Sequence, residues 1–344
     1  MRILSATDAI SPAISRTRDL LFRPFRWGTF LKLCAVAAIT ERLAGRSNFW
    51  KQGGGGGSHL SGSPMLYNIS PQMIFFIVLF CIVGLMVGVA ILYLVTRLRF
   101  ALFECLVHQS TEIRPGWHIY REPARRFFWL CLGVGLGYLA FAATVLSPML
   151  VGIFRHLHAN PGQRMPMSAI LELVLPLIPV LFLLVVTAIA VDIVLRDFML
   201  PHIALDNATA GEALEAVWNH ISAEKGTFFL YAVLRILLPL VAMIALAIAL
   251  IIPGVILFGG GGVMIAMLKA AAVNGSGGMS VVSGMLQAIL VIAMAALALF
   301  MAVIFGGPMS IALRNYALVF YGGRYPVLGD TMFPPRAGTP PLTA

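Results

Sequence analysis

Long, nearly uninterrupted apolar runs constrain this chain more than any other feature. Runs that begin at Pro71, Phe127, Gly226 and Met279 each extend over about 20 residues or more, the length that a helix needs to cross the hydrocarbon layer. Over the whole chain 60% of the residues are hydrophobic, only 11% are charged, and the mean hydropathy is +0.92. Soluble globular domains are much more polar than this. The sequence therefore predicts an all-α integral membrane protein.

A dense group of arginines between two of these runs sets the orientation of the helices. Its six members are Arg97, Arg99, Arg114, Arg121, Arg125 and Arg126. Short loops rich in Lys and Arg stay on the cytoplasmic side of a membrane. Segment 97–126 is therefore predicted to be cytoplasmic, and the helices before and after it run inward and outward, respectively.

The apolar runs divide the chain into a transmembrane domain, 27–330, between two polar ends. We predict six spans, at about residues 28–44, 71–96, 127–151, 170–195, 226–252 and 279–305. Cytoplasmic interfacial segments are expected at 97–126, 197–225 and 308–325, a basic amphipathic segment at 1–26, and a flexible Pro-rich tail at 331–344. Run 28–44 is short and, taken alone, equally suits a re-entrant or interfacial segment. Segment 253–278 is glycine-rich and is predicted to be a loop, which either dips into the membrane or stays outside it.

The distribution of basic residues favours six crossings with both termini in the cytoplasm. In that topology only six of the 24 Lys and Arg residues lie outside, namely Arg42, Arg46, Lys51, Arg155, Arg164 and Lys269. The remaining 18 lie on the cytoplasmic side or in helix ends near it, as the positive-inside rule requires. If run 28–44 did not cross, the N-terminal arginines would be on the outside.

Short motifs recur along the chain and indicate an internal repeat. Gly28-Thr29-Phe30 opens the first span and Gly226-Thr227-Phe228 opens the fifth. After later spans, Ile203-Ala204-Leu205-Asp206-Asn207 matches Ile311-Ala312-Leu313-Arg314-Asn315. We therefore predict three parallel two-helix repeats with interfacial amphipathic helices, an arrangement known among transporters.

Two local patterns concern individual helices. Segment Thr209–Glu224 is predicted to be a helix outside the membrane, because Thr209 and Glu212 have the spacing of a capping box. In the second and third spans, glycines four residues apart are predicted to form close packing faces between helices; they are Gly84 with Gly88 and Gly133 with Gly137.

Charged residues inside or beside the spans are the candidate functional residues. Asp192 and Arg196 have the i,i+4 spacing of an ion pair, and Arg235 lies about two turns into the next outward helix. Together with Glu104 they are predicted to form an intramembrane polar cluster, which either lines a substrate path or only clasps helices together. Further arginines are predicted to contact lipid headgroups, namely Arg16, Arg18, Arg23, Arg26, Arg97, Arg99, Arg125 and Arg126.

The sequence shows no catalytic constellation, so we predict no catalytic residue, no metal site and no cofactor. His156 and His158 have a metal-compatible spacing but stand alone, and the four cysteines lack CxxC spacing. The formal net charge of +10 arises from basic residues that flank apolar helices. Membrane lipids are therefore the expected partners, with a protein partner in a membrane complex as an open option, and nucleic acid is not expected.

Four motifs resemble those of an uncharacterised family of bacterial polytopic membrane proteins. They are Leu21-Phe22-Arg23-Pro24-Phe25, Arg97-Leu98-Arg99-Phe100, Asp197-Phe198-Met199-Leu200-Pro201 and Arg314-Asn315-Tyr316-Ala317-Leu318. That family is distantly similar to the membrane region attached to some glycerophosphoryl diester phosphodiesterases. The resemblance covers about residues 15–330. It implies a helical membrane fold and carries over no catalytic residue.

These observations predict a non-enzymatic protein of the bacterial cytoplasmic (inner) membrane. Its expected role is that of a transporter-like or lipid-interacting helical bundle, or of an accessory subunit of a membrane complex. The alternative is a structural or assembly scaffold that recruits a partner, and a third option is a membrane-embedded enzyme acting on lipids.

Overall fold

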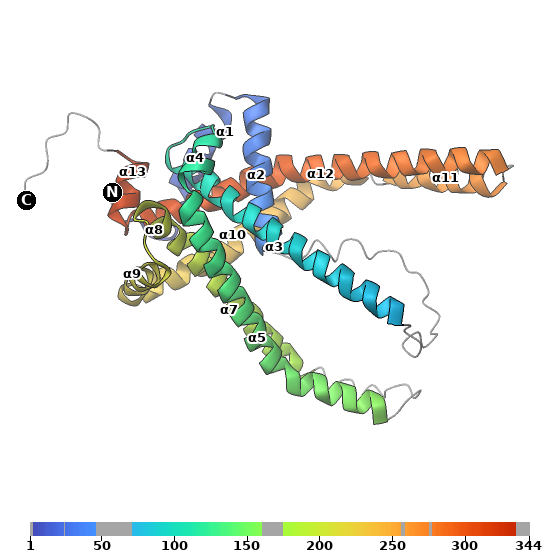
Figure 1. Cartoon of the computed structure of the whole chain (residues 1–344). Helices are drawn as coiled ribbons and strands as arrows, with labels where there is room; N and C mark the ends of the chain where they lie inside the picture. Colours follow the sequence, from blue (N-terminus) through green and yellow to red (C-terminus); the bar gives the residue numbers. More distant parts are fainter. Residues whose placement is uncertain are drawn as a thin grey trace, which may run out of the picture. The chain divides into compact units, whose positions relative to one another are not determined.

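The computed structural model describes residues 3–23, 25–45, 71–159, 175–255, 259–274 and 277–334, and throughout these ranges it is helical without any strand (Figure 1). Its principal helices are α1 (Ile10–Phe22), α2 (Trp27–Gly45), α3 (Pro71–Val107), α4 (Arg114–Ile119), α5 (Arg121–Ala159), α7 (Leu177–Ile193), α8 (Leu200–Leu205), α9 (Ala210–Ala223), α10 (Lys225–Gly254), α11 (Gly260–Asn274), α12 (Gly277–Gly322) and α13 (Pro326–Met332). A π-helical segment, η2 (Val194–Met199), joins α7 to α8. The part of the predicted Pro-rich tail beyond Pro334 lies outside these ranges.

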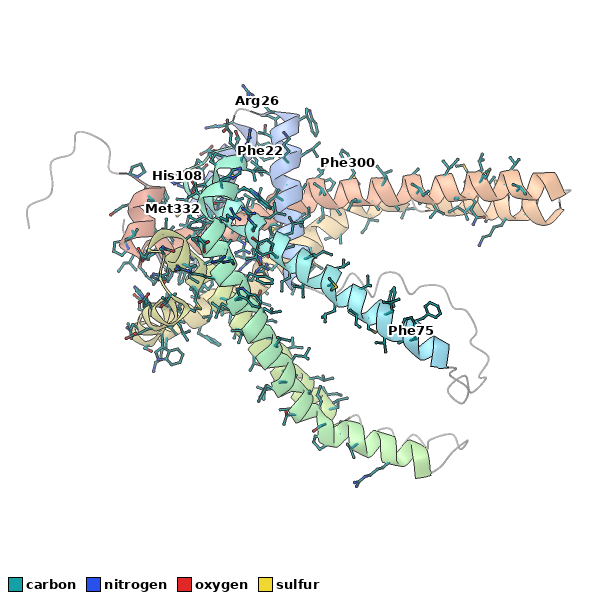
Figure 2. All side chains as sticks on the ribbon, in the orientation of Figure 1. Phe22, Arg26, Phe75, His108, Phe300 and Met332 are labelled. Atoms are coloured by element: carbon teal, nitrogen blue, oxygen red, sulfur yellow. The ribbon has the colours of Figure 1, made fainter. Side chains whose placement is uncertain are left out.

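Five described helices are long and apolar enough to cross a membrane, which confirms an all-α, multi-pass membrane protein. They cover Phe75–Val107, Arg121–Met149, Leu177–Leu205, Lys225–Ile248 and Val281–Gly322. Their large apolar side chains point outward over most of this length, as expected where lipid is the neighbour (Figure 2). The first predicted span, 28–44, is helical as α2 but is not one of the five, so the number six is not confirmed.

Helices α3 and α12 extend well beyond the thickness of a bilayer. Helix α3 has 37 residues and α12 has 46, or about 55 and 69 Å at 1.5 Å per residue, against about 30 Å of hydrocarbon. The span predicted to end near Thr96 thus continues as one helix to Val107. In α3 the side chains of 75–89 are exposed, whereas nearly all of those from Val95 onward are buried. We call the exposed part of such a helix its arm and the buried part its root.

Segment 253–278, predicted to be a loop, contains the helix α11. It lies alongside α12 (Figure 1), and a side chain added at Gly261 would meet the Met294 side chain of that helix. The physical reason is that an apolar stretch without water satisfies its backbone hydrogen bonds most simply as a helix. Helix α5 also extends further than predicted, since it continues to Ala159 and the third span was predicted to end at about residue 151.

The contacts separate into two units, which we describe one at a time. Unit 1 comprises the described residues of 1–53, 102–113 and 226–344. In this unit α1, α2, α11 and α13 all pack on α12. The inner face of α1 includes Leu20 and Leu21, which are both buried. Thr17 lies on the same face of α1, and its hydroxyl accepts a hydrogen bond from the side-chain nitrogen Nδ2 of Asn315 on α12 at 2.9 Å.

Helix α2 crosses the root of α12 at very short distance. A Cβ atom added to Gly307 would collide with the Cβ of Cys34 and would lie 2.6 Å from its Cα and 2.9 Å from its carbonyl oxygen. Only a residue without a side chain allows two backbones to approach so closely. By contrast, nothing lies within 4 Å of the corresponding positions at Gly84, Gly88, Gly133 and Gly137, so the packing predicted for these glycines is not seen among the described residues.

Arg16 ties three separate segments of unit 1 together. Its guanidinium donates to the carbonyls of Leu106 and Val107 at 3.0 and 3.1 Å and to that of Met332 at 2.9 Å. The first two carbonyls belong to the last turn of α3, where helix carbonyls lack partners and a cation complements the helix dipole. The Phe333 ring covers the same guanidinium at 4.8 Å. Burial lowers the pKa of Arg16, yet arginine remains charged at physiological pH.

Unit 2 comprises the described residues of 54–101 and 114–225, and α5 packs there on α7, α8 and α9. The Tyr138 hydroxyl of α5 donates to the Leu184 carbonyl of α7. The predicted helix near Thr209–Glu224 is confirmed as α9, and so is its capping box. The Thr209 amide donates to the Glu212 carboxylate at 2.8 Å, while the Glu212 amide donates to the Thr209 hydroxyl at 3.4 Å.

Candidate functional site

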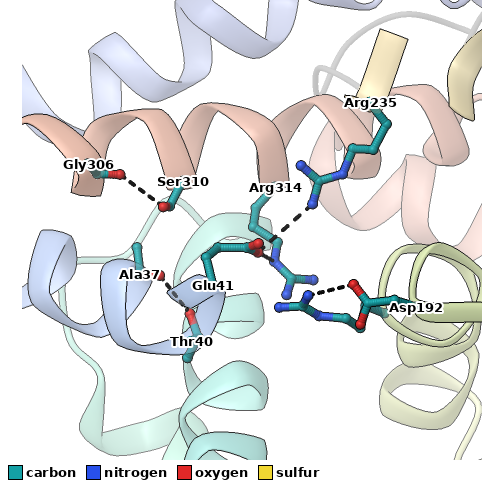
Figure 3. Close-up of polar contacts among 9 residues, drawn as sticks. Ala37, Thr40, Glu41, Asp192, Arg235, Gly306, Ser310 and Arg314 are labelled. Atoms are coloured by element: carbon teal, nitrogen blue, oxygen red, sulfur yellow. Dashed lines mark hydrogen bonds and ion pairs between the residues drawn. The ribbon is translucent and has the colours of Figure 1, made fainter. Parts of the chain in front are cut away.

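The most concentrated charge in unit 1 is a group of three residues on three different helices. The Glu41 carboxylate of α2 lies 2.6 Å from Nε of Arg314 on α12 and 3.9 Å from Nη2 of Arg235 on α10 (Figure 3). The three side chains are only 17, 9 and 11% exposed, respectively. We call Glu41, Arg235 and Arg314 the arginine–glutamate group.

Aromatic side chains one to two turns away pack the same helices together. The Tyr231 ring of α10 stacks on Tyr316 of α12 at 5.2 Å and on Phe320 at 4.5 Å between centroids. Nearby hydroxyls bond within their own helices, since Ser310 donates to the Gly306 carbonyl at 2.9 Å and Thr40 to that of Ala37 at 3.0 Å (Figure 3). The stacked rings therefore join α10 to α12 within two turns of Arg235 and Arg314.

This arrangement combines a high desolvation cost with a specific chemical capacity. Removing three charges from water costs several kcal/mol per ion in general, and mutual pairing offsets that cost. Guanidinium groups bind carboxylate and phosphate oxygens through two parallel N–H donors. The arginine–glutamate group can thus act as an ion-pair clasp between α2, α10 and α12, or as a receptor in which an anion competes with Glu41 for the arginines.

Unit 2 contains a second charged group, and here the predicted pair is confirmed. The Asp192 carboxylate accepts from Nη1 of Arg196 at 2.7 Å (Figure 3). Asp192 is 43% exposed and Arg196 only 5%. Arg196 and the buried Asp197 lie in η2, and π-helical segments are frequent at functional sites.

Side chains from two further helices lie near this pair. Cys131 of α5 is close enough to Asp192, Arg196 and Arg99 for their charges to act on its thiol, and Arg99 is itself buried on α3. Charged residues near Cys131 therefore come from α3, α7 and η2, although the one close contact, between Asp192 and Arg196, is made within one helical turn.

The other two residues of the predicted cluster belong to unit 1 and have partners there. Arg235 pairs with Glu41, and the Glu104 carboxylate lies 3.6 Å from Nε2 of His108, which directly follows the last residue of α3. The structure thus brings Asp192 and Arg196 together, and the four-residue cluster stays a prediction. Sequence reasoning missed Glu41 as a site residue, although a carboxylate inside an apolar run was the available signal.

The arginines predicted to contact headgroups fall into two classes. Some are engaged inside the protein: Arg16 is held by three carbonyls, Arg99 is buried, and Arg97 donates to the Trp117 carbonyl at 2.6 Å beneath the Trp117 ring. The others are exposed, namely Arg18, Arg23, Arg26, Arg125 and Arg126. Of these, Arg125 lies 3.0 Å from Glu122 and Arg126 lies 3.4 Å from the Asn207 side-chain oxygen.

No metal site is seen in the described part of the chain. No three residues among its His, Cys, Asp and Glu side chains are close enough to hold an ion. His156 and His158, whose spacing alone is compatible with a metal, fall at the end of α5, where side chains are not described.

Comparison with known proteins identifies one family. A family model described as a family of unknown function, DUF7544, matches residues 4–330. No curated protein and no solved structure matches the chain. The predicted likeness to the membrane region of glycerophosphoryl diester phosphodiesterases is not shown, whereas membership of an uncharacterised family is confirmed. The chain belongs to the DUF7544 family of unknown function.

Proposed function

We propose that this chain is a non-enzymatic protein of the bacterial inner membrane that binds an anionic lipid or an anionic small molecule in a transporter-like helical bundle. The observation that carries the proposal is the arginine–glutamate group. Arg235 and Arg314 lie in two of the five helices suited to crossing the membrane, namely α10 and α12. Glu41 contacts both arginines from α2, which is not one of the five. Charged residues in such helices are costly, and they commonly mark a ligand or ion path.

The finer topology in this proposal has six crossings, three parallel repeats and both termini in the cytoplasm. The positions of 18 of the 24 basic residues support it. With five crossings the two termini would lie on opposite sides of the membrane. Reporter fusions at each end distinguish the two topologies, because equal cytoplasmic signals are expected only for an even number of crossings.

The binding function is tested by native mass spectrometry of protein extracted in mild detergent. We expect a bound anionic lipid or small molecule in the wild type, retained in Arg235→Lys and lost in Arg235→Gln. Arg125→Gln, which neutralises an exposed arginine in the other unit, is the matched control and should retain the ligand. If Arg235→Gln lowers thermal stability but keeps the ligand, the group is a clasp and the proposed binding function is wrong.

A second candidate function is a scaffold that recruits a protein partner, and a specific observation favours it. Helix α9 buries Ala213 and Val217 but leaves Leu214 and Trp218 exposed, 48 and 65% respectively, one turn apart on its surface. Exposed apolar residues beside a buried stripe are typical of partner-binding helices. A protein that co-purifies with the wild type and is lost from the double variant Leu214→Ser/Trp218→Ser would support this role. Asn219→Ser on the same helix is the control.

A further inference from the structure

The junction between α1 and α2 carries a cluster of aromatic side chains on the outside of unit 1. The rings of Phe22, Phe25, Trp27 and Phe30 lie 5.1 to 6.1 Å apart between centroids. Phe30 is buried, but Phe22, Phe25 and Trp27 are 49, 44 and 60% exposed. Three large rings are thus held against one another with much of their surface uncovered within the chain.

Exposed arginines flank these aromatic residues in the sequence. Arg18 and Arg23 share one carboxylate, with Asp19 Oδ1 at 4.0 and 3.6 Å, and Arg26 is exposed between Phe25 and Trp27 in the sequence. Solvent-exposed ion pairs of this kind contribute little stability and are readily exchanged for another anion. The described residues from Arg18 to Phe30 carry three arginines against one carboxylate.

The packing of α1 fixes which way this surface faces. The opposite side of the helix, with Ala13 and Thr17, is buried on α12, and Arg16 is held by three carbonyls. The outer side presents Ile14, Arg18 and Phe22, one turn apart from each other. Figure 2 labels Phe22 and Arg26 at this junction. The packing of α1 on α12 therefore leaves this side of the helix uncovered.

We propose that Arg18, Phe22, Arg23, Phe25, Arg26 and Trp27, here called the junction surface, dock on an anionic bilayer. Aromatic rings with a polar tip or a cationic neighbour prefer the headgroup level of a membrane. Arginines near the bilayer surface add attraction to anionic lipids. A lipid surface matches both features at once: it takes the exposed rings among its acyl chains and the three arginines among its phosphates. The chain supplies the necessary proximity, since α12, on which α1 packs, is itself suited to crossing the membrane.

The inference depends on the multi-pass character of the chain and not on the arginine–glutamate group, so the two proposals fail separately. The test uses the full-length protein in lipid nanodiscs, where both membrane faces are accessible. Trp27 emission is obtained by subtracting the spectrum of Trp27→Phe from that of the wild type. It is recorded in phosphatidylcholine with and without phosphatidylglycerol, each either unbrominated or brominated near the top of the acyl chains.

We expect brominated lipid to quench Trp27, with stronger quenching when phosphatidylglycerol is present. The increment due to phosphatidylglycerol should disappear in Arg18→Gln/Arg23→Gln/Arg26→Gln. If that variant does not fold, the same increment in the wild type should disappear at 1 M salt, where the screening length is about 3 Å. Quenching by acrylamide instead of lipid would place the junction surface in water. Protection from both quenchers would place it against a protein. Either result overturns the proposal.

Discussion

The two charged groups of this protein are built in opposite ways. In unit 1, Glu41 meets Arg235 and Arg314 from three helices that are far apart in the sequence. In unit 2, Asp192 and Arg196 form their contact within one helical turn. The first geometry exists only when tertiary packing is complete, whereas the second forms wherever that helix forms. Removing one member should therefore affect the stability of the whole protein in unit 1 and only the local helix in unit 2.

The largest effect is expected for Glu41→Gln. It leaves two poorly exposed guanidinium groups without their shared carboxylate, and breaking a buried ion pair typically costs about 3 to 5 kcal/mol. The free energy of unfolding in mixed micelles measures this loss. Glu112→Gln, at an exposed glutamate in the same unit, is the control and should change it little. A loss no greater than that of the control would remove the distinction between the two groups.

The next effect concerns the helix crossing that brings Glu41 to α12. Gly307→Ala places a methyl group against the backbone of Cys34 and forces α2 away from α12, so we expect a loss of about 1 to 3 kcal/mol. The matched control is Gly284→Ala in the same helix, where nothing lies within 4 Å of the added atom. Equal stability of the two variants would show that α2 does not approach α12 as described.

A smaller and more local effect is expected at the start of α9. Thr209→Ala removes the capping box and should cost about 1 kcal/mol, seen as faster hydrogen exchange in α9 with the rest of unit 2 unchanged. Because the Thr209 amide and hydroxyl stabilise the Glu212 carboxylate, the pKa of Glu212 is lowered from its usual 4.5. Its contribution is therefore present at neutral pH and is lost as the pH falls through the lowered pKa.

Acid should thus loosen the start of α9 in the wild type and much less in Glu212→Gln, because a neutral amide keeps the hydrogen bond at every pH. Hydrogen exchange measured along an acid titration gives the comparison. A protein whose whole fold loosened together with α9 would contradict the local character assigned to these contacts.

The smallest effect is expected for Asp192→Asn. Its carboxylate is 43% exposed, so solvent screens the pair and we expect a loss of less than about 1 kcal/mol, even though Arg196 itself is only 5% exposed. The unfolding experiment used for Glu41→Gln measures it, with Glu122→Gln on α5 as an exposed control from a second same-helix pair. A loss as large as that of Glu41→Gln would show that Asp192 contributes to tertiary packing as Glu41 does, and the distinction between the two charged groups would be lost.

The contrast also separates what the sequence could predict from what it could not. Helices α3, α5 and α9 and the Asp192–Arg196 pair follow from local periodicity and spacing, so they were predicted. The meeting of Glu41 with Arg235 and Arg314 depends on the crossing at Gly307, and nothing in the sequence near Glu41 specifies that neighbour. The glycine pairs at 84/88 and 133/137 show the converse, since a local packing motif found no partner among the described residues. Helix α11 was missed because its flanking glycines resemble a loop.

The three-carbonyl clamp of Arg16 has a consequence for how the protein is made. Arg16 and Met332 are 316 positions apart. At ribosomal rates of about 5 to 20 residues per second, roughly 15 to 60 s pass between the synthesis of the two residues. During that time α1 has emerged while one of its holding partners does not yet exist. The order of synthesis therefore makes the docking of α1 a late step, completed only after the membrane-crossing helices between these residues have been made.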